Sequence, residues 1–133
     1  MEAINVLLFV ESRYKVNRKR IKKTLSGLLR EHGIKEAEVS VAVVGDRKMR
    51  QLNKQYRNLD KTTNVLSFSI AEGEATILPP SAKNNDSHIL RLGDVVISYP
   101  QIITEAAAEG TLVDDKVDEL LQHGTLHLLG IHH

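Results

Sequence analysis

The stretch LVDDKVDELLQHGTLHLLG, residues 112–130, decides the fold, because it predicts a helix that is apolar over much of its circumference. Its apolar positions are Val113, Val117, Leu120, Leu121, Leu128 and Leu129. A helix of this kind must pack against other elements on several sides, so we expect it to be the central buried helix. Gly130 is its expected end, since glycine commonly follows the last turn of a helix.

The segments before this helix mix strand and helix patterns. Runs of β-branched and apolar residues predict strands at residues 3–10, 38–45, 63–70 and 92–100. Helical spacing predicts helices at residues 16–32, 46–57 and 100–110, the first two with N-caps at Asn17 and Asp46. Residues 71–91 are rich in turn formers and predict a long loop. We therefore expect an α+β (mixed α/β) fold over residues 1–133, one small domain in which about four strands form a mixed sheet packed with helices.

Composition narrows the class of protein. The chain has 133 residues, of which 41% are apolar and 26% charged, as is typical of a globular protein. It has no cysteine, so disulfides are excluded and a metal would have to be held by His, Asp or Glu. No apolar run approaches the ~20 residues of a membrane span, and the N-terminus lacks the basic start of a signal peptide. We expect a cytoplasmic protein without a membrane partner.

Charge is distributed unevenly along the chain. Residues 1–50 hold 12 Lys and Arg against 6 Asp and Glu, while residues 51–133 hold 6 against 11. The basic cluster RKRIKK, residues 18–23, lies in the first part. Two interpretations stay open for it: a solvated helix face, or a contact with the phosphate backbone of a nucleic acid.

The last eleven residues, HGTLHLLGIHH, hold four of the six histidines. His123 and His127 are four positions apart, so on a helix they project from one face and can bind one metal ion. After a turn at Gly130 the chain can fold back and offer His133 as a third ligand, with His132 as the alternative. Three neutral imidazoles would leave one coordination position open for water, which is typical of a catalytic site.

Zinc proteases with the sequence HExxHxxGxxH share this spacing of histidines. In this chain Gly124 stands where those enzymes carry the glutamate that acts as general base. Peptide hydrolysis by that mechanism is therefore not expected. Phosphodiester chemistry is the natural alternative, with a metal to activate water and an arginine to neutralise the phosphate.

Three stretches carry a resemblance to a known family. HGTLHLLGIHH resembles the signature H-G-x-L-H-L-x-G-Y-D-H of the YbeY family of ribosomal-RNA maturation endoribonucleases. LNKQYRNLDKTTNVLSF, residues 52–68, is similar to its segment L-N-x-x-Y-R-x-x-x-x-x-T-D-V-L-S-F, and LGDVVIS, residues 92–98, to its strand L-G-D-I-x-I-S. The chain departs from these patterns at Asn64, Ile131 and His132, and it stops at His133, where family members usually continue into a further acidic helix.

The resemblance implies a site. It implies one divalent metal per chain, expected to be zinc, held by His123, His127 and His133. It also places the important arginine of the family on Arg57, which would bind the phosphate and take part in catalysis together with His127. Without the resemblance, we would interpret Arg57 as an ordinary surface arginine.

Further residues are expected around this site. Arg18, Lys19 and Arg20 would contact the RNA backbone. Ser67, with Phe68, would complete the strand and the wall of the cleft. Asp94 either orients a ligand histidine or caps a turn after Gly93. Glu119, one turn before His123, could likewise support a ligand histidine.

The leading hypothesis is a metal-dependent, single-strand-specific endoribonuclease in ribosomal RNA processing. The resemblance implies a part in maturation of the 3′ end of 16S ribosomal RNA and in ribosome biogenesis and quality control. Its implied partners are ribosomal RNA and the small ribosomal subunit with its proteins. Two alternatives remain: a metal hydrolase acting on another substrate, including peptides with a base supplied from elsewhere, and a ribosome-associated binding factor whose metal is structural.

Overall fold

The structure is a computed structural model that describes residues 3–74, 77 and 89–131. The elements follow one another as β1 (Ala3–Val10), α1 (Arg18–Glu31), β2 (Glu36–Val44), α2 (Asp46–Arg57), β3 (Val65–Ser69), β4 (Leu90–Ser98), α3 (Tyr99–Glu109) and α4 (Val113–Leu128). This order confirms the predicted α+β class. Most of the loop predicted at residues 71–91 lies outside the described residues.

The four strands form one mixed sheet in the order β1-β2-β4-β3. β1, β2 and β4 are parallel to one another, and β3 is antiparallel to β4. β4 ends at Ser98 rather than at Pro100, because α3 already begins at Tyr99 with the proline in its first turn, where a missing N–H costs nothing. The sheet confirms the prediction of about four mixed strands.

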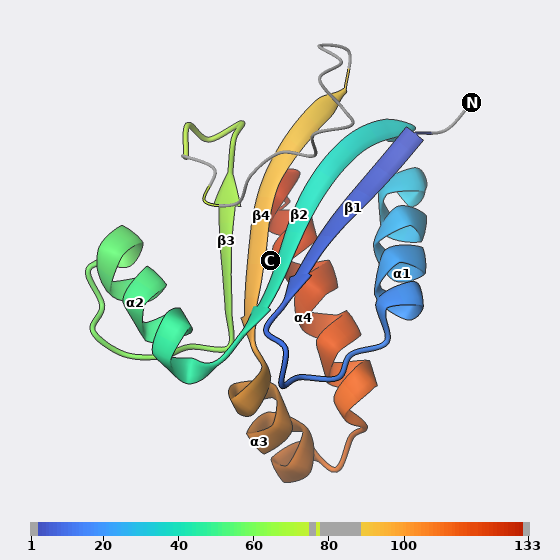
Figure 1. The fold of residues 1–133 in the computed structure, drawn as a ribbon. Coiled ribbons are helices and arrows are strands. Elements are labelled where there is room, and N and C mark those ends of the chain that lie inside the picture. Colours follow the sequence, from blue (N-terminus) through green and yellow to red (C-terminus); the bar gives the residue numbers. More distant parts are fainter. Residues whose placement is uncertain (1–2, 75–76, 78–88, 132–133) are drawn as a thin grey trace.

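Helices cover the two faces of the sheet unequally (Figure 1). α1 and α4 pack on one face, and the main core lies between them and the sheet, with Val95, Ile97, Leu121 and Leu128 almost fully buried. α2 packs on the opposite face, over a smaller cluster that contains Phe68. α4 contacts α1, α3, β3 and β4, so the prediction of a central buried helix is confirmed. No helix in the described part of the chain is long and apolar enough to cross a membrane.

Gly93 allows β3 and β4 to come close together. Its φ is +135°, and a Cβ there would lie 2.0 Å from the carbonyl oxygen of Phe68. Only glycine fits this position, because other residues would be strained and would clash with the backbone of β3. The register between β2 and β4 shifts at the same place, next to Val39.

The two predicted N-caps have different outcomes. Asn17 caps α1, and its side chain accepts a hydrogen bond from the backbone N–H of Arg20 at 3.0 Å. The prediction for Asp46 is wrong, because Gly45 occupies the N-cap of α2 and Asp46 is the first helical residue. The Asp46 carboxylate instead joins distant segments by accepting hydrogen bonds from Thr62 Oγ1, Ser98 Oγ and Gln101 Nε2 at 2.9 to 3.0 Å.

These contacts make stability depend on the ionisation of Asp46. Burial raises the pKa of this carboxyl, but the hydrogen bonds from Ser98, Thr62 and Gln101 outweigh burial and lower it. Because the folded pKa is lowered, this stabilisation is full above the unfolded value of ~3.9 and is lost as pH falls through the folded pKa. We expect Asp46→Asn to reduce the free energy of unfolding by about 1–3 kcal/mol at neutral pH.

Urea unfolding at pH 7 and at steps below pH 4 measures this effect. The difference between wild type and Asp46→Asn should shrink as the pH falls. Glu36→Gln, at an exposed position at the start of β2, is the matched control and should unfold like the wild type at neutral pH. A difference that stays constant down to the lowest pH would contradict the assignment.

Candidate active site

Two of the predicted metal ligands, His123 and His127, lie one turn apart on α4. His123 is exposed and His127 is half-buried. His127 Nδ1 lies 2.6 Å from Ser67 Oγ on β3, which fixes the orientation of the imidazole ring. Nε2 is therefore the ring nitrogen that would coordinate a metal, since a hydrogen bond at one nitrogen selects the other as ligand.

Arg57 reaches the same serine from the end of α2. Its Nη2 donates a hydrogen bond to the Ser67 carbonyl oxygen at 2.9 Å, and its guanidinium carbon lies 4.6 Å from the centroid of the Phe68 ring. Ser67 thus contacts Arg57 through its main chain and His127 through its hydroxyl. The structure brings these three predicted site residues, which come from α2, β3 and α4, together at the edge strand β3, with Phe68 as the wall beneath Arg57.

Glu74 is a further partner of Arg57 that the sequence analysis did not predict. Glu74 Oε2 lies 2.7 Å from Arg57 Nη2, and Glu74 Oε1 accepts a hydrogen bond from the Ser69 N–H at 3.2 Å. The acid lies in the turn-rich stretch after β3, where a single glutamate has no distinguishing pattern. A phosphate that binds Arg57 would meet or replace this carboxylate, because both groups bind a guanidinium in the same way.

Position 124 shows how closely α4 lies on the sheet. A Cβ on Gly124 would be 2.6 Å from Val95 Cγ1 of β4. The position that carries the general base in HExxH proteases therefore points into the core. A glutamate there could not be accommodated without moving the helix away from β4.

Arg20 does not occupy the place expected for an RNA contact. It reaches across to α4, where its guanidinium contacts Asp115 at 2.5 Å and Asp118 at 2.7 Å. The hydrogen bonds that Arg20 donates to Asp115 and to Asp118 raise the pKa of its guanidinium well above the usual value. The predicted backbone contact is corrected: Arg20 joins α1 to α4, and only Arg18 and Lys19 of the three are exposed.

The surroundings of His123 are acidic. A hollow of about 500 Å³ beside it is lined by Asp115, Asp118 and Glu119 as well as by Arg20. The exposed carboxylate of Glu119 is bound by Lys116 Nζ at 2.6 Å. Glu119 thus shares a hollow with His123, as expected from the spacing, while its hydrogen bond goes to a lysine.

Asp94 is buried on the wrong face of the sheet for its predicted role. Val95 of β4 faces α4, so Asp94 and Val96 face α2. Asp94 Oδ2 accepts a hydrogen bond from the backbone N–H of Ile77 at 2.5 Å. The sheet separates this carboxylate from His123 and His127, so the hypothesis that it orients one of them is wrong. The alternative of a cap is also wrong, because β4 continues through this position without a turn.

The expected third ligand lies outside the described residues, as does its alternative: these are His133 and His132. Among residues 3–74, 77 and 89–131, no three His, Asp or Glu side chains lie close enough together to hold a metal ion. The described part supplies two imidazoles four residues apart on α4, a spacing that suits two ligands of one metal ion.

Fold and site together define a class of small α+β proteins. In this class one helix, α4, carries a pair of histidines, and the neighbouring strand, β3, contacts both one of these histidines and an arginine. A family model described as "Endoribonuclease YbeY" matches residues 9–133. The chain belongs to the YbeY family, and the resemblance seen in its sequence is confirmed.

Curated relatives support this membership. The chain is 35% identical to the endoribonuclease YbeY of Dehalococcoides mccartyi, covering 98% of this chain and 83% of that protein. It is 37% identical to the endoribonuclease YbeY of Bartonella quintana, covering 90% of this chain and 69% of that protein. A solution structure of a Thermotoga maritima protein matches 98% of this chain and 74% of its own, with a TM-score of 0.61 at 23% identity, which supports the fold.

Proposed function

We propose that this protein is a metal-dependent endoribonuclease that cleaves single-stranded ribosomal RNA in the cytoplasm. The observation that carries the proposal is the double contact of Ser67, which places Arg57 and His127 on either side of one residue. The names of the relatives supply the substrate class, since they are endoribonucleases. We further propose maturation of the 3′ end of 16S ribosomal RNA as the task, with the small ribosomal subunit and its proteins as partners, in ribosome biogenesis and quality control.

His123 and His127 would hold the metal together with His133. The donor set suits zinc, one ion per chain, because the chain has no cysteine and two imidazoles stand one helical turn apart. When bound, zinc supplies a Lewis acid and makes water a better nucleophile at neutral pH. Ser67 would support this role by keeping the His127 ring in the orientation that turns Nε2 to the metal.

Arg57 would bind the phosphate that is attacked. Its planar guanidinium can make two parallel hydrogen bonds to phosphate oxygens and stabilise the charge that develops there. The Ser67 carbonyl, the Phe68 ring and the Glu74 carboxylate hold it in place before substrate arrives. Such preorganisation matters because a fixed donor does not have to be reoriented during the reaction.

The tight packing at Gly124 argues against a glutamate general base at this position, as HExxH proteases use it, so peptide hydrolysis would need a base supplied from elsewhere. The binding-factor alternative differs from the proposal in what the metal does. A structural metal would stabilise the fold without being required for turnover.

Metal removal tests the proposal. Protein purified without chelator and without a nickel column should carry about one metal ion per chain, as one three-histidine site would hold. Treatment with chelator should abolish cleavage of a single-stranded ribosomal RNA fragment, and added zinc should restore it. Undiminished cleavage by metal-free protein would contradict the proposal, while RNA binding without cleavage by the metal-loaded protein would favour the binding factor.

A further inference from the structure

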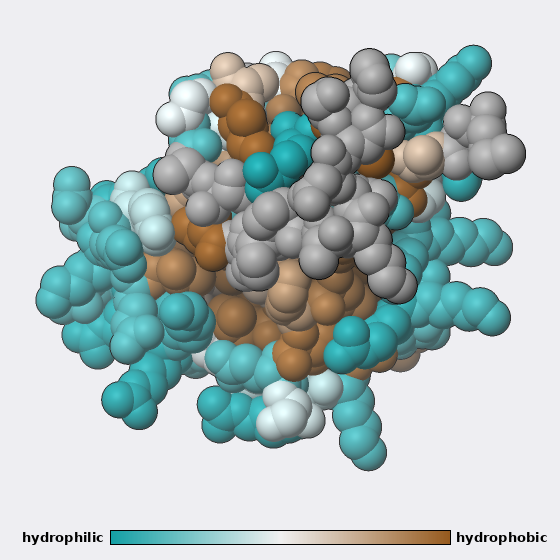
Figure 2. Space-filling model, turned by 45° about the horizontal axis from the view of Figure 1, so that its top comes forward, coloured by the Kyte–Doolittle hydropathy of each residue, from teal (hydrophilic) through white to brown (hydrophobic). Residues whose placement is uncertain are grey.

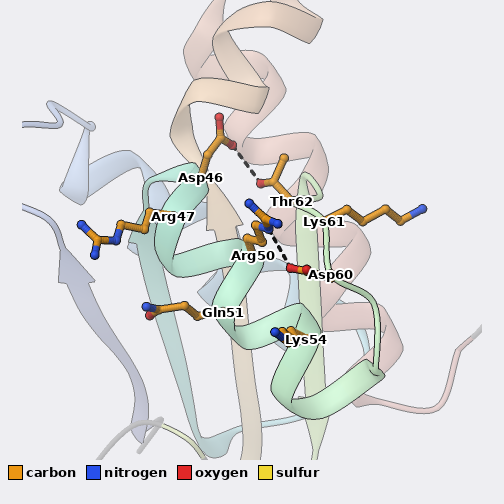
Figure 3. A pocket seen from close by; sticks show the side chains of 8 residues that line it. All are labelled: Asp46, Arg47, Arg50, Gln51, Lys54, Asp60, Lys61 and Thr62. Atoms are coloured by element: carbon orange, nitrogen blue, oxygen red, sulfur yellow. Dashed lines mark hydrogen bonds and ion pairs between the residues drawn. The ribbon is translucent and has the colours of Figure 1, made fainter.

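The outward face of α2 carries a group of cations to which neither the fold nor the candidate active site assigns a role. We call Arg47, Arg50 and Lys54 of α2, with Lys61 of the loop that follows, the α2 track. The three helical members are spaced by three and four positions, so they share one side of the helix (Figure 3). Together with Asp46, Gln51, Asp60 and Thr62, they line a hollow of about 700 Å³.

The α2 track is not needed to hold the helix on the sheet. α2 is attached through Met49 and Leu52, which are buried on the opposite side of the helix. All four cations of the α2 track are exposed. Hydrophilic side chains cover the side of the molecule on which α2 lies (Figure 2). Exposed cations without a structural function point to a partner of opposite charge.

Most of the charge of the α2 track is left uncompensated. Arg50 contacts the Asp60 carboxylate at 2.7 Å, and Lys54 lies near enough to help lower the pKa of the Asp60 carboxyl, but no carboxylate of the described residues forms a close ion pair with Arg47, Lys54 or Lys61. Asp46 turns its carboxylate to the hydroxyls of Thr62 and Ser98 and to Gln101 rather than to a cation. Four cations against two carboxylates leave the hollow positive, as a binding site for phosphates requires.

The α2 track also leads to the candidate active site. Lys54 is one turn before Arg57 on the same helix, and Arg57 contacts Ser67 next to His127. The hollow beside His123 differs in charge, because three carboxylates, those of Asp115, Asp118 and Glu119, line it against the single guanidinium of Arg20. A polyanion would be repelled there and attracted along α2.

We propose that the α2 track binds the sugar–phosphate backbone of single-stranded RNA and directs the strand to Arg57. This inference rests on the proposed function for the identity of the substrate, and it replaces the α1 cluster as the main backbone contact. The four residues would bind phosphates and not base edges, so they should increase affinity for any sequence.

The test is a triple variant, Arg47→Ala with Lys54→Ala and Lys61→Ala, which leaves the Arg50–Asp60 pair intact. Its binding to a fluorescent single-stranded 2′-O-methyl RNA, which resists cleavage, is measured across a salt titration. We expect affinity to fall on the order of tenfold or more at low salt and the salt slope to decrease by about 2, since each lost phosphate contact on a single strand contributes ~0.7. Cleavage at saturating RNA should stay near that of the wild type.

Two further variants sharpen the test. Lys22→Ala with Lys23→Ala and Lys35→Ala removes three exposed cations at or near α1 and should leave binding close to wild type. Asp60→Asn removes a negative charge and releases Arg50, so it should tighten binding and steepen the salt slope. Unchanged binding by the α2 triple variant, or an equal loss in the α1 control, would overturn the inference.

The two proposals fail in different ways. Wild-type protein that binds RNA through the α2 track but cleaves none of it when loaded with zinc would remove the proposed catalysis and leave the inference standing. Cleavage that depends on metal and Arg57 but is insensitive to the α2 variants in both affinity and salt slope would remove only the inference.

Discussion

His127→Ala is expected to lose nearly all RNA cleavage and most of the bound metal. The His127 ring is already oriented by the 2.6 Å contact of its Nδ1 with Ser67 Oγ. If His123, His127 and His133 hold the metal as proposed, the loss of one ligand leaves too few donors to bind zinc tightly. Metal content by elemental analysis and single-turnover cleavage of a single-stranded ribosomal RNA fragment measure both losses.

Two variants serve as controls for this result. His32→Ala removes a histidine near the C-terminal end of α1, where its ring contacts the Leu28 carbonyl oxygen, and should leave metal content unchanged. Ser67→Ala keeps the imidazole but removes its support, so metal affinity should fall by ~10–100-fold, as is usual for a lost partner of a ligand histidine. Full metal occupancy in His127→Ala would show that the site has been assigned to the wrong residues.

Arg57→Ala is expected to reduce the rate of RNA cleavage by ~10²–10³, the usual cost of one lost donor to a developing charge. Its metal content should stay near that of the wild type, because Arg57 contacts Ser67 through the carbonyl and not through the hydroxyl that supports His127. Binding of RNA should also change little, since many phosphates share the binding energy. Single-turnover cleavage at saturating RNA separates this effect from affinity.

Glu74→Gln is the control variant for Arg57→Ala, because it changes the partner of the arginine and keeps the arginine itself. The amide can still accept a hydrogen bond from the guanidinium, but it no longer competes with phosphate as an anion. We expect a much smaller change in the cleavage rate than in Arg57→Ala, with a lower KM for RNA. Wild-type cleavage by Arg57→Ala would remove the proposed role of the arginine.

The sequence by itself determined the local elements and their class. Helical spacing located α4, and the residues that repeat along it, Leu121 and Leu128 among them, are buried as expected. Runs of β-branched residues located all four strands, with boundaries that differ by at most two residues. These features follow from periodicity, which depends only on neighbours along the chain. The spacing of His123 and His127 on α4 is local in the same sense.

Tertiary structure alone decided which side chains meet. Successive side chains of β4 point to opposite faces of the sheet, so Val95 faces α4 and Asp94 faces α2. No local sequence pattern indicates which face of the sheet each helix covers. The sequence predicts Arg20 to be a free cation, whereas in the folded protein Asp115 of α4 lies beside it.

The partners of Asp46 and Arg57 lie on other elements or loops. Thr62, Ser98 and Gln101 reach Asp46 from the loop before β3, the end of β4 and α3. Glu74 reaches Arg57 from the turn after β3. Contacts of this kind depend on how the layers stack and on strand register, so the sequence names the candidate residues and the packed fold selects their partners.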